Sequence, residues 1–299
     1  MLRALLIYLS QATWARRIAR NWKLTWRVAS RFVAGEALDE ALQAIQVLNE
    51  CGIYATLDHL GEHVSTPQEA LAAKDEILKL LEGIEQSGVS AGISIKLTQI
   101  GMGLGESVCE DNLREILSLA KVKENFVRID MEDSPFTDVT LDLFFKMHDE
   151  GFSEHVGIVI QAYLYRSAED VQKILESKGR IRLCKGAYNE PVSVAFPKKK
   201  DVDQNFDQLT QMMLEASLEY ESALSDDCRT PPIPAIATHD KDRIEFAKDY
   251  AEKIGLLRES LEFQMLYGIR EDFQRQLVEM NYPVRVYVPY GTEWYPYFV

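Results

Sequence analysis

The sequence predicts an α/β protein whose main part is a (β/α)8 TIM-like barrel preceded by N-terminal helices. From residue 53 onward, short apolar runs alternate with longer segments of helical periodicity. A strict alternation of strands and helices implies parallel strands joined by right-handed crossovers. Eight such units indicate a barrel, because an open doubly wound sheet more often has about five to seven strands.

The expected strands are short runs of aliphatic and β-branched residues, bounded by polar or glycine-containing segments. They cover residues 53–57, 92–97, 126–131, 157–161, 181–184, 233–238, 261–266 and 284–288. No run reaches the roughly 18 apolar residues that a membrane-spanning helix needs.

The segments between the strands carry apolar residues at helical spacing, so helices are expected at residues 67–85, 141–150, 168–177, 206–223, 242–254 and 271–280. Residues 197–201, with three consecutive lysines, and residues 226–234 are expected to be surface loops. Residues 291–299 should begin the last barrel helix, and because the sequence ends there we expect a barrel lacking its C-terminal helix. The expected domains are a helical arm over residues 1–50 and a barrel over residues 51–299, truncated at the eighth helix.

The charge balance argues against nucleic acid as a partner. The 299 residues include 33 Lys and Arg against 47 Asp and Glu, a net charge of −14. Affinity for nucleic acid depends on neutralising phosphates with basic side chains, which this net charge opposes.

The four cysteines form no C-x-x-C pair and suggest neither a zinc site nor a disulfide framework. With no small-residue cleavage site after the first apolar run, the expected location is cytoplasmic.

The first 35 residues differ in charge from the remainder. They hold seven basic residues and no acidic one, a local charge of +7, against −21 for the remainder. Trp14, Trp22 and Trp26 are interleaved with these bases at near-helical spacing, which predicts one or two basic amphipathic helices. Such helices either lie on an anionic lipid surface or dock their aromatic face on the barrel.

Polar side chains end six adjacent strands, where chemistry collects in this fold. Ionisable groups inside apolar runs are costly unless they are paired or functional, so the set predicts an active site rather than a structural ion-pair layer. The residues are Lys96, Asp130, Gln161, Arg182 with Lys185, His239 and Tyr267.

The end of the fifth strand fits an anionic, planar redox cofactor. Arg182 and Lys185 place two cations beside Gly186 and Ala187, which allow close backbone approach to a pyrophosphate. The alternative is a turn that merely needs glycine.

Three other patterns carry less weight. Gly101, Gly103 and Gly105 follow the second strand, whereas the dinucleotide fingerprint follows the first, so a loop is expected. His59 and His63 would be spaced as metal ligands on a helix, but no third ligand is identified and no metal is expected. A Schiff-base lysine, Lys96 or Lys185, would require a depressed pKa.

The strand-end segments together resemble the proline dehydrogenases, a family of flavin-dependent barrels. The resemblance rests on eight segments in order: DHLGEHV (58–64), IKLT (95–98), RIDMED (128–133), VIQAYL (159–164), RLCKGAY (182–188), ATHD (237–240), EFQMLYG (262–268) and RVYVPYGTEWYPY (285–297). Their joint order and spacing cover nearly all of residues 50–299.

The resemblance implies an oxidation of L-proline to pyrroline-5-carboxylate by hydride transfer to the N5 atom of FAD, with electrons passed to a quinone. It assigns Asp130, Arg182 and Tyr267 as catalytic, with Asp130 and Tyr267 hydrogen-bonded to each other, and Lys96 and Tyr267 as substrate-binding. FAD-binding positions would be Met131, Gln161, Arg182, Lys185, Gly186, Ala187, Tyr188, Thr238 and His239. Because a quinone resides in the bilayer, the basic arm gains a reason to lie at the inner face of the membrane.

The family continues past the position of Tyr297 with an arginine pair that binds the substrate carboxylate, and this sequence ends at Val299. The expectation is a chain that holds FAD and binds proline weakly. Two alternatives stay open: a lysine-dependent Schiff-base aldolase, and a non-catalytic flavin-binding remnant.

Overall fold

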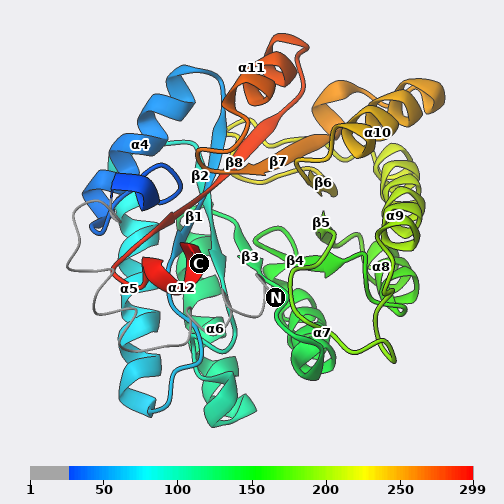
Figure 1. Ribbon diagram of the computed structural model, residues 1–299. Coiled ribbons are helices and arrows are strands. Elements are labelled where there is room, and N and C mark those ends of the chain that lie inside the picture. Colours follow the sequence, from blue (N-terminus) through cyan, green and yellow to red (C-terminus); the bar gives the residue numbers. More distant parts are fainter. Residues whose placement is uncertain (1–26, 299) are drawn as a thin grey trace.

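A computed structural model describes residues 27–298, and it shows a closed barrel of eight parallel strands in the order β1 to β8 (Figure 1). The strands are β1 Tyr54–His59, β2 Ala91–Ile95, β3 Val127–Ile129, β4 Val156–Gln161, β5 Arg180–Cys184, β6 Pro234–Ala237, β7 Glu262–Leu266 and β8 Val284–Tyr290. Each overlaps an expected run, so the predicted (β/α)8 barrel is confirmed.

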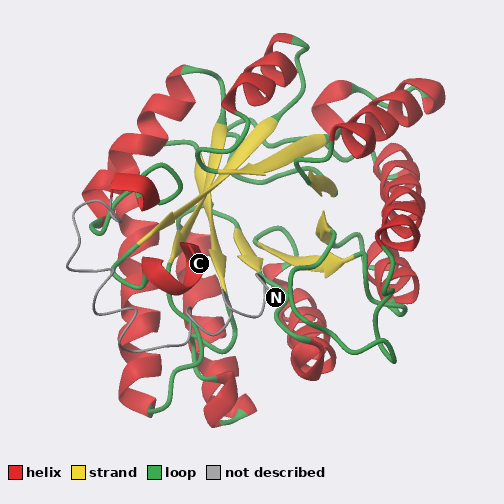
Figure 2. Cartoon of the chain, viewed as in Figure 1, coloured by secondary structure: helices red, strands yellow, loops and turns green. Residues whose placement is uncertain are grey.

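Helices surround the strands on the outside of the barrel (Figure 2). They are α4 Leu38–Glu50, α5 Pro67–Ser87, α6 Glu106–Val122, α7 Thr137–Met147, α8 Ser167–Glu176, α9 Lys199–Glu219, α10 Lys241–Ile254, α11 Glu271–Glu279 and the short α12 Trp294–Phe298. Within residues 27–298, no helix is long and apolar enough to cross a membrane.

The strands present different residues to their two faces because side chains alternate along a strand. Residues such as Leu57, Ile93 and Ile158 are fully buried in the apolar layer between the strands and the helices. The alternate positions carry polar side chains that meet across the barrel, for example Arg182 of β5 and Ser94 of β2. The barrel interior is therefore polar, and the apolar core lies outside the strands.

Local sequence explains where the helices flanking the mouth begin and end. Helix α5 starts at a capping box, in which the Thr66 hydroxyl accepts from the Glu69 amide and the Glu69 carboxylate accepts from the Thr66 amide. It ends at Gly88, whose φ of 67° suits the left-handed cap. Helix α10 starts at Asp240, whose carboxylate accepts from the amide of Asp242.

Two loop expectations were wrong at their ends. Helix α9 begins at Lys199 and takes in most of the lysine run at 197–201, because Lys199 pairs with Asp203 one turn later and with Asp240 across the loop. Pro234 opens β6 instead of closing the preceding loop, a position that proline tolerates.

The expectation that His59 and His63 share a helix was also wrong: His59 ends β1, and His63 follows in a loop with a φ of 53°.

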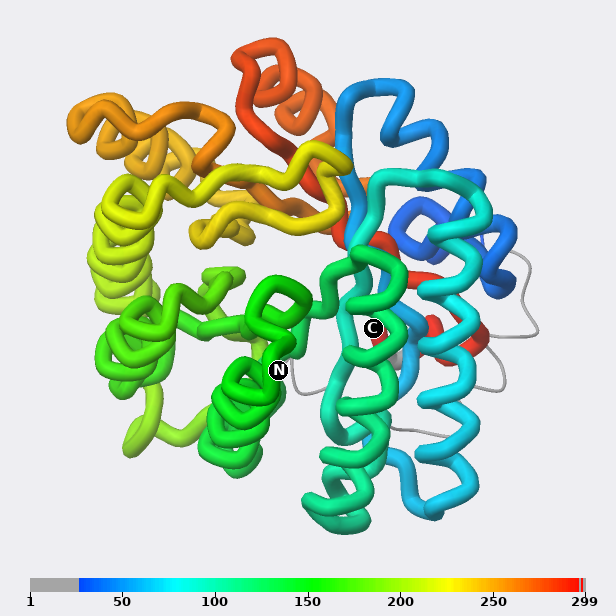
Figure 3. Tube along the Cα trace, turned by 180° about the vertical axis from the view of Figure 1, so that it is seen from behind, coloured from blue at the N-terminus to red at the C-terminus, as the bar shows by residue number. Residues whose placement is uncertain are grey.

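The described end of the N-terminal arm docks on the barrel. Ala29 and Val33 are buried, and the amide of Ala34 donates to the carbonyl of Pro289 over 2.9 Å. The two ends of the described chain, blue and red, consequently lie side by side in Figures 1 and 3. This segment docks through Ala29 and Val33, whereas Trp14, Trp22 and Trp26 lie outside the described residues, so docking of the aromatic face stays a prediction.

Candidate active site

Asp130 is the centre of a ring of polar side chains at the carboxyl ends of the strands. Its Oδ1 accepts hydrogen bonds from Ser94 Oγ and from Nη1 of Arg182, each over 2.8 Å. Its Oδ2 accepts from the hydroxyl of Tyr287, also over 2.8 Å. Donors from three other strands thus hold one carboxylate in place at the barrel mouth.

The expected hydrogen bond between Asp130 and Tyr267 was wrong, because Tyr287 supplies the hydroxyl. Tyr267 follows β7, and its amide donates to the carbonyl of Tyr287. Tyr287 lies within β8, two residues after the inward-facing Arg285, so the strand period points both into the barrel. That alternation in the eighth run was the signal that sequence reasoning missed.

Arg182 is held rigidly below the mouth and is only 6% exposed. Its Nε donates to Gln264 over 2.6 Å, and Gln264 in turn donates to Glu262 over 2.6 Å. Its Nη2 reaches the Thr56 hydroxyl at 3.4 Å. A guanidinium tied to several strands presents a fixed positive charge beside Asp130.

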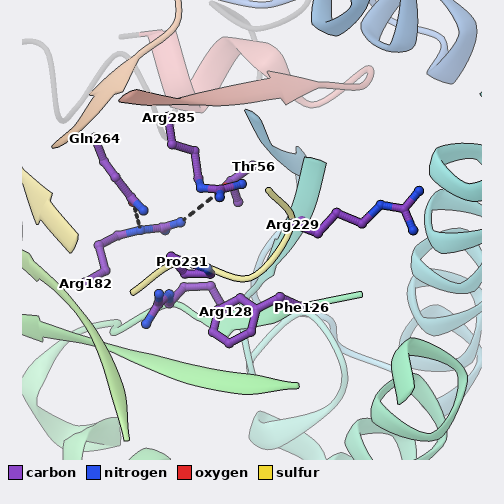
Figure 4. A pocket seen from close by; sticks show the side chains of 9 residues that line it. Thr56, Phe126, Arg128, Arg182, Arg229, Pro231, Gln264 and Arg285 are labelled. Atoms are coloured by element: carbon purple, nitrogen blue, oxygen red, sulfur yellow. Dashed lines mark hydrogen bonds between the residues drawn. The ribbon is translucent and has the colours of Figure 1, made fainter. Parts of the chain in front are cut away.

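A small pocket lies beneath Arg182 (Figure 4). Figure 4 shows Arg182 extended between Gln264 and Thr56, with Arg285 approaching from β8. The pocket that these side chains line leaves no room for a water molecule. Ligands therefore reach the polar ring through the mouth, not through this floor.

Lys96 lies between two carboxylates. Its Nζ is 3.4 Å from Asp58 Oδ2 and 4.0 Å from Asp130 Oδ2. Burial opposes the charged form, but the two carboxylates outweigh burial and raise the pKa of Lys96. A Schiff-base nucleophile needs the opposite shift, so the aldolase alternative loses its support at this lysine.

A second charged group lies beyond the ends of β5 and β6. Lys185 Nζ contacts Asp203 of α9 and Asp240, each at 2.5 Å. Burial works against ionisation of Asp240, but the hydrogen bond from Lys185 prevails and lowers the pKa of Asp240 to about 2. Beside this group a cleft of about 520 Å³ opens between α9 and α10, lined by Lys199, Lys200, Asp203, Gln204, Asp207 and Arg243.

Gln161 offers a free acceptor suited to a flavin. It ends β4, and its Nε2 donates to the carbonyls of Met131 and Glu132 at 3.2 and 3.3 Å. Its Oε1 is buried with no hydrogen-bond partner among the described residues. A buried acceptor without a partner is costly, and a ring N–H of a bound cofactor would satisfy it.

Thr238 and His239 directly follow β6, at the mouth of the barrel. His239 Nε2 accepts the amide of Leu266 over 3.0 Å, so Nδ1 carries the proton of the neutral ring. Burial, assisted by the charge of Arg270, lowers the pKa of His239. The neutral imidazole therefore has one N–H available to a ligand.

Gly186 occupies a position that other residues cannot take without strain. Its φ is 106°, and an added Cβ atom would lie 2.4 Å from the ring of Tyr163. Ala187 is exposed and Tyr188 is partly buried in the same irregular segment. The predicted FAD-binding stretch is thus a close backbone turn at the mouth.

One group of three side chains could in principle ligate a metal. Ligand atoms of Glu62, His63 and Glu132 lie within 4.8 Å of one another. The Glu132 carboxylate, however, already accepts from both the amide and the hydroxyl of Thr98. We therefore assign no metal to this group.

The fold and the mouth define the class of protein: a barrel enzyme whose polar groups meet at the carboxyl ends of parallel strands. A family model described as Proline dehydrogenase matches residues 41–297. The chain belongs to the proline dehydrogenase family, flavin-dependent oxidoreductases that act on proline in the first step of proline catabolism.

Individual relatives agree with the family match. The chain is 42% identical to Proline dehydrogenase of Deinococcus radiodurans over 276 residues, which cover 91% of this chain and 84% of that protein. It is 40% identical to Proline dehydrogenase 1 of Bacillus subtilis (strain 168), over 100% of this chain and 93% of that protein. The crystal structure of proline utilization A (PutA) from Bdellovibrio bacteriovorus, inactivated by N-propargylglycine, superposes with a TM-score of 0.82 at 26% identity. That match covers 91% of this chain and 32% of the PutA chain.

Proposed function

We propose that FAD is the cofactor of this enzyme, that the product from L-proline is pyrroline-5-carboxylate, and that a quinone receives the electrons. The observation that carries the proposal is the convergence of Asp130, Arg182, Tyr287 and Lys96 at the mouth. This ring lies beside the free Oε1 of Gln161, one strand away.

The residues of the mouth divide into a cofactor side and a substrate side. Bound FAD would supply the acceptor for the hydride that leaves the carbon next to the proline nitrogen. Met131, Gln161, Lys185, Gly186, Ala187, Tyr188, Thr238 and His239 would hold it, with the Lys185 cation suited to its pyrophosphate. The fixed charge of Arg182 would favour the electron-rich state of the cofactor.

On the substrate side, Asp130 and Lys96 present opposite charges 4.0 Å apart. The carboxylate of Asp130 would accept a hydrogen bond from the ring ammonium of proline, and the ammonium of Lys96 would orient the ring. Tyr287 would fix Asp130 in the required rotamer through its hydroxyl.

An anaerobic visible absorption spectrum, recorded before and after addition of L-proline, tests the proposal. We expect flavin bands that bleach with L-proline and persist with L-valine, which lacks the secondary amine. Bands that persist with both amino acids would favour the non-catalytic flavin-binding alternative. Protein that takes up no FAD would contradict the cofactor assignment, and borohydride trapping with a carbonyl substrate would then test the aldolase alternative.

A further inference from the structure

Asp58 is a buried carboxylate to which the proposed function gives no role. It lies in β1, its side chain is 0% exposed, and its Oδ2 is 3.4 Å from Lys96 Nζ. Its Oδ1 has no hydrogen-bond partner among the described residues. A buried carboxylate with a free oxygen is costly to keep ionised, which makes it a good place for a proton.

The two carboxylates beside Lys96 differ in how well their charge is stabilised. Asp130 accepts hydrogen bonds from Ser94, Arg182 and Tyr287. Asp58 has the longer contact with Lys96 and lies near the Tyr287 hydroxyl, whose single proton goes to Asp130. With fewer donors to its charge, Asp58 is the better placed of the two carboxylates to receive a proton.

We propose that Asp58 is the terminal proton acceptor of the active site and that the Lys96 ammonium passes the proton to it. This inference rests on the proposed oxidation of proline. Proline enters as a secondary ammonium, and one of its N–H bonds must break before the nitrogen lone pair can form the C=N bond. An Nζ proton of Lys96 first moves to Oδ2 of Asp58, and the lone pair left on Nζ then takes up the proline proton. Lys96 keeps its charge, an O–H bond forms on Asp58, and no electrons are exchanged in the transfer.

The other titratable groups around Asp58 are His59 on the same strand, Lys96, Asp130, Tyr287 and Tyr290 of β8, and Tyr297 of α12. Burial raises the pKa of each of these tyrosines and lowers the pKa of His59, so these groups stay neutral near neutral pH. Burial likewise raises the pKa of Asp58, against the opposing charge of Lys96. The proton-accepting form of Asp58 is therefore lost as the pH falls, and the reaction should slow in acid.

The decisive experiment is anaerobic stopped-flow reduction of the bound flavin by L-proline across the acid and neutral pH range. Asp58→Asn should lower the reduction rate constant about 100-fold, in the range for removal of a proton acceptor, and abolish the decline at low pH. Asp58→Glu should restore part of the rate and the decline. The matched control is Glu132→Gln, which removes a buried carboxylate that Thr98 holds instead of Lys96, and which should keep the decline.

A second measurement follows the proton itself. Infrared difference spectra on mixing with proline should show a new carboxylic acid C=O band in the wild-type protein and in Glu132→Gln. The band should be absent from Asp58→Asn. Flavin absorbance and the Tm of each variant establish that the variants fold and hold the cofactor.

The outcomes separate this inference from the proposed function. If proline does not bleach the wild-type flavin, the proposed function is wrong. If the wild-type flavin bleaches and Asp58→Asn keeps both its rate and its acid decline, only the role of Asp58 is wrong. Should Asp58→Asn fail to fold, the wild-type infrared spectrum and the pH profile of Asp58→Glu decide: a missing carboxylic acid band overturns the inference.

Discussion

The hydroxyl of Tyr287, in β8, donates a hydrogen bond of 2.8 Å to Oδ2 of Asp130 at the end of β3. The two residues face each other across the barrel mouth and are 157 positions apart in the sequence. The bond links the eighth strand to the carboxylate that Arg182 and Ser94 hold from the other side. It therefore makes the geometry of the site depend on closure of the barrel.

Tyr287→Phe removes this hydroxyl and should lower kcat/KM for proline about 10-fold, the value of one hydrogen bond to a charged group. Steady-state dye reduction measures the effect. Tyr267→Phe is the matched control, because its hydroxyl is not bonded to Asp130, and it should retain more activity. A larger loss in Tyr267→Phe than in Tyr287→Phe would instead support the original assignment of Tyr267.

Gln264→Leu should destabilise the fold, because it leaves Nε of Arg182 buried without its acceptor and removes the donor to Glu262. We expect a loss of about 2–4 kcal/mol in the free energy of unfolding, measured by urea denaturation. Gln172→Leu, at an exposed site on α8, should change that free energy by less than about 0.5 kcal/mol. Equal stability of the two variants would show that Arg182 needs no support from Gln264.

Gly186→Ala should weaken FAD binding and lower stability through two effects, the strained φ of 106° and the contact with Tyr163. Gly88→Ala isolates the first effect, since Gly88 has a φ of 67° and no atom near its added Cβ. The control should lose about 1 kcal/mol of stability and leave flavin affinity unchanged. Flavin titration and urea denaturation measure both quantities. Similar flavin affinity in the two variants would contradict a role for Gly186 in the cofactor turn.

Asp240 should make stability fall in acid. Its pKa is lowered to about 2, chiefly because the hydrogen bond from Lys185 outweighs burial, against 3.8 ordinarily. The folded state thus holds the proton on Asp240 less tightly than the unfolded chain does. The contribution of Asp240 to the free energy of unfolding is present above pH 3.8 and disappears as the pH falls through about 2. Asp240→Asn, which can still cap α10, should flatten the free energy of unfolding over this window. The exposed Asp142→Asn should leave the slope unchanged, and an equal slope in Asp240→Asn would refute the pairing.

The basic arm should bring the protein to anionic membranes, as the quinone proposal requires. The full chain should co-sediment with vesicles rich in anionic lipid and less so with neutral vesicles or at high salt. Deletion of residues 1–26 should abolish binding, and it spares the buried Ala29 and Val33 that dock on the barrel. Vesicle binding that survives this deletion would show that the arm does not reach the lipid.

Much of the candidate site could be predicted from the sequence. Lys96, Asp130, Gln161 and Arg182 were identified because polar residues at the ends of apolar strands point into a barrel mouth, and the structure places them there. The partner of Asp130 was assigned by resemblance to Tyr267, one strand away from the tyrosine that fills the role. Asp58 and Gln264 lie in segments that carry the resemblance but were given no role in the reaction, because nothing local distinguishes them from other polar residues inside strands.

The sequence by itself determined the barrel, since strand and helix periodicity and their alternation are local properties that survive without knowledge of contacts. It also determined which end of the barrel carries the chemistry. Only the tertiary structure decided which donor meets which acceptor: Tyr287 and not Tyr267 for Asp130, and Asp58 for Lys96. The physical reason is that a hydrogen bond depends on tenths of an ångström, and those distances are fixed by the register and closure of all eight strands together.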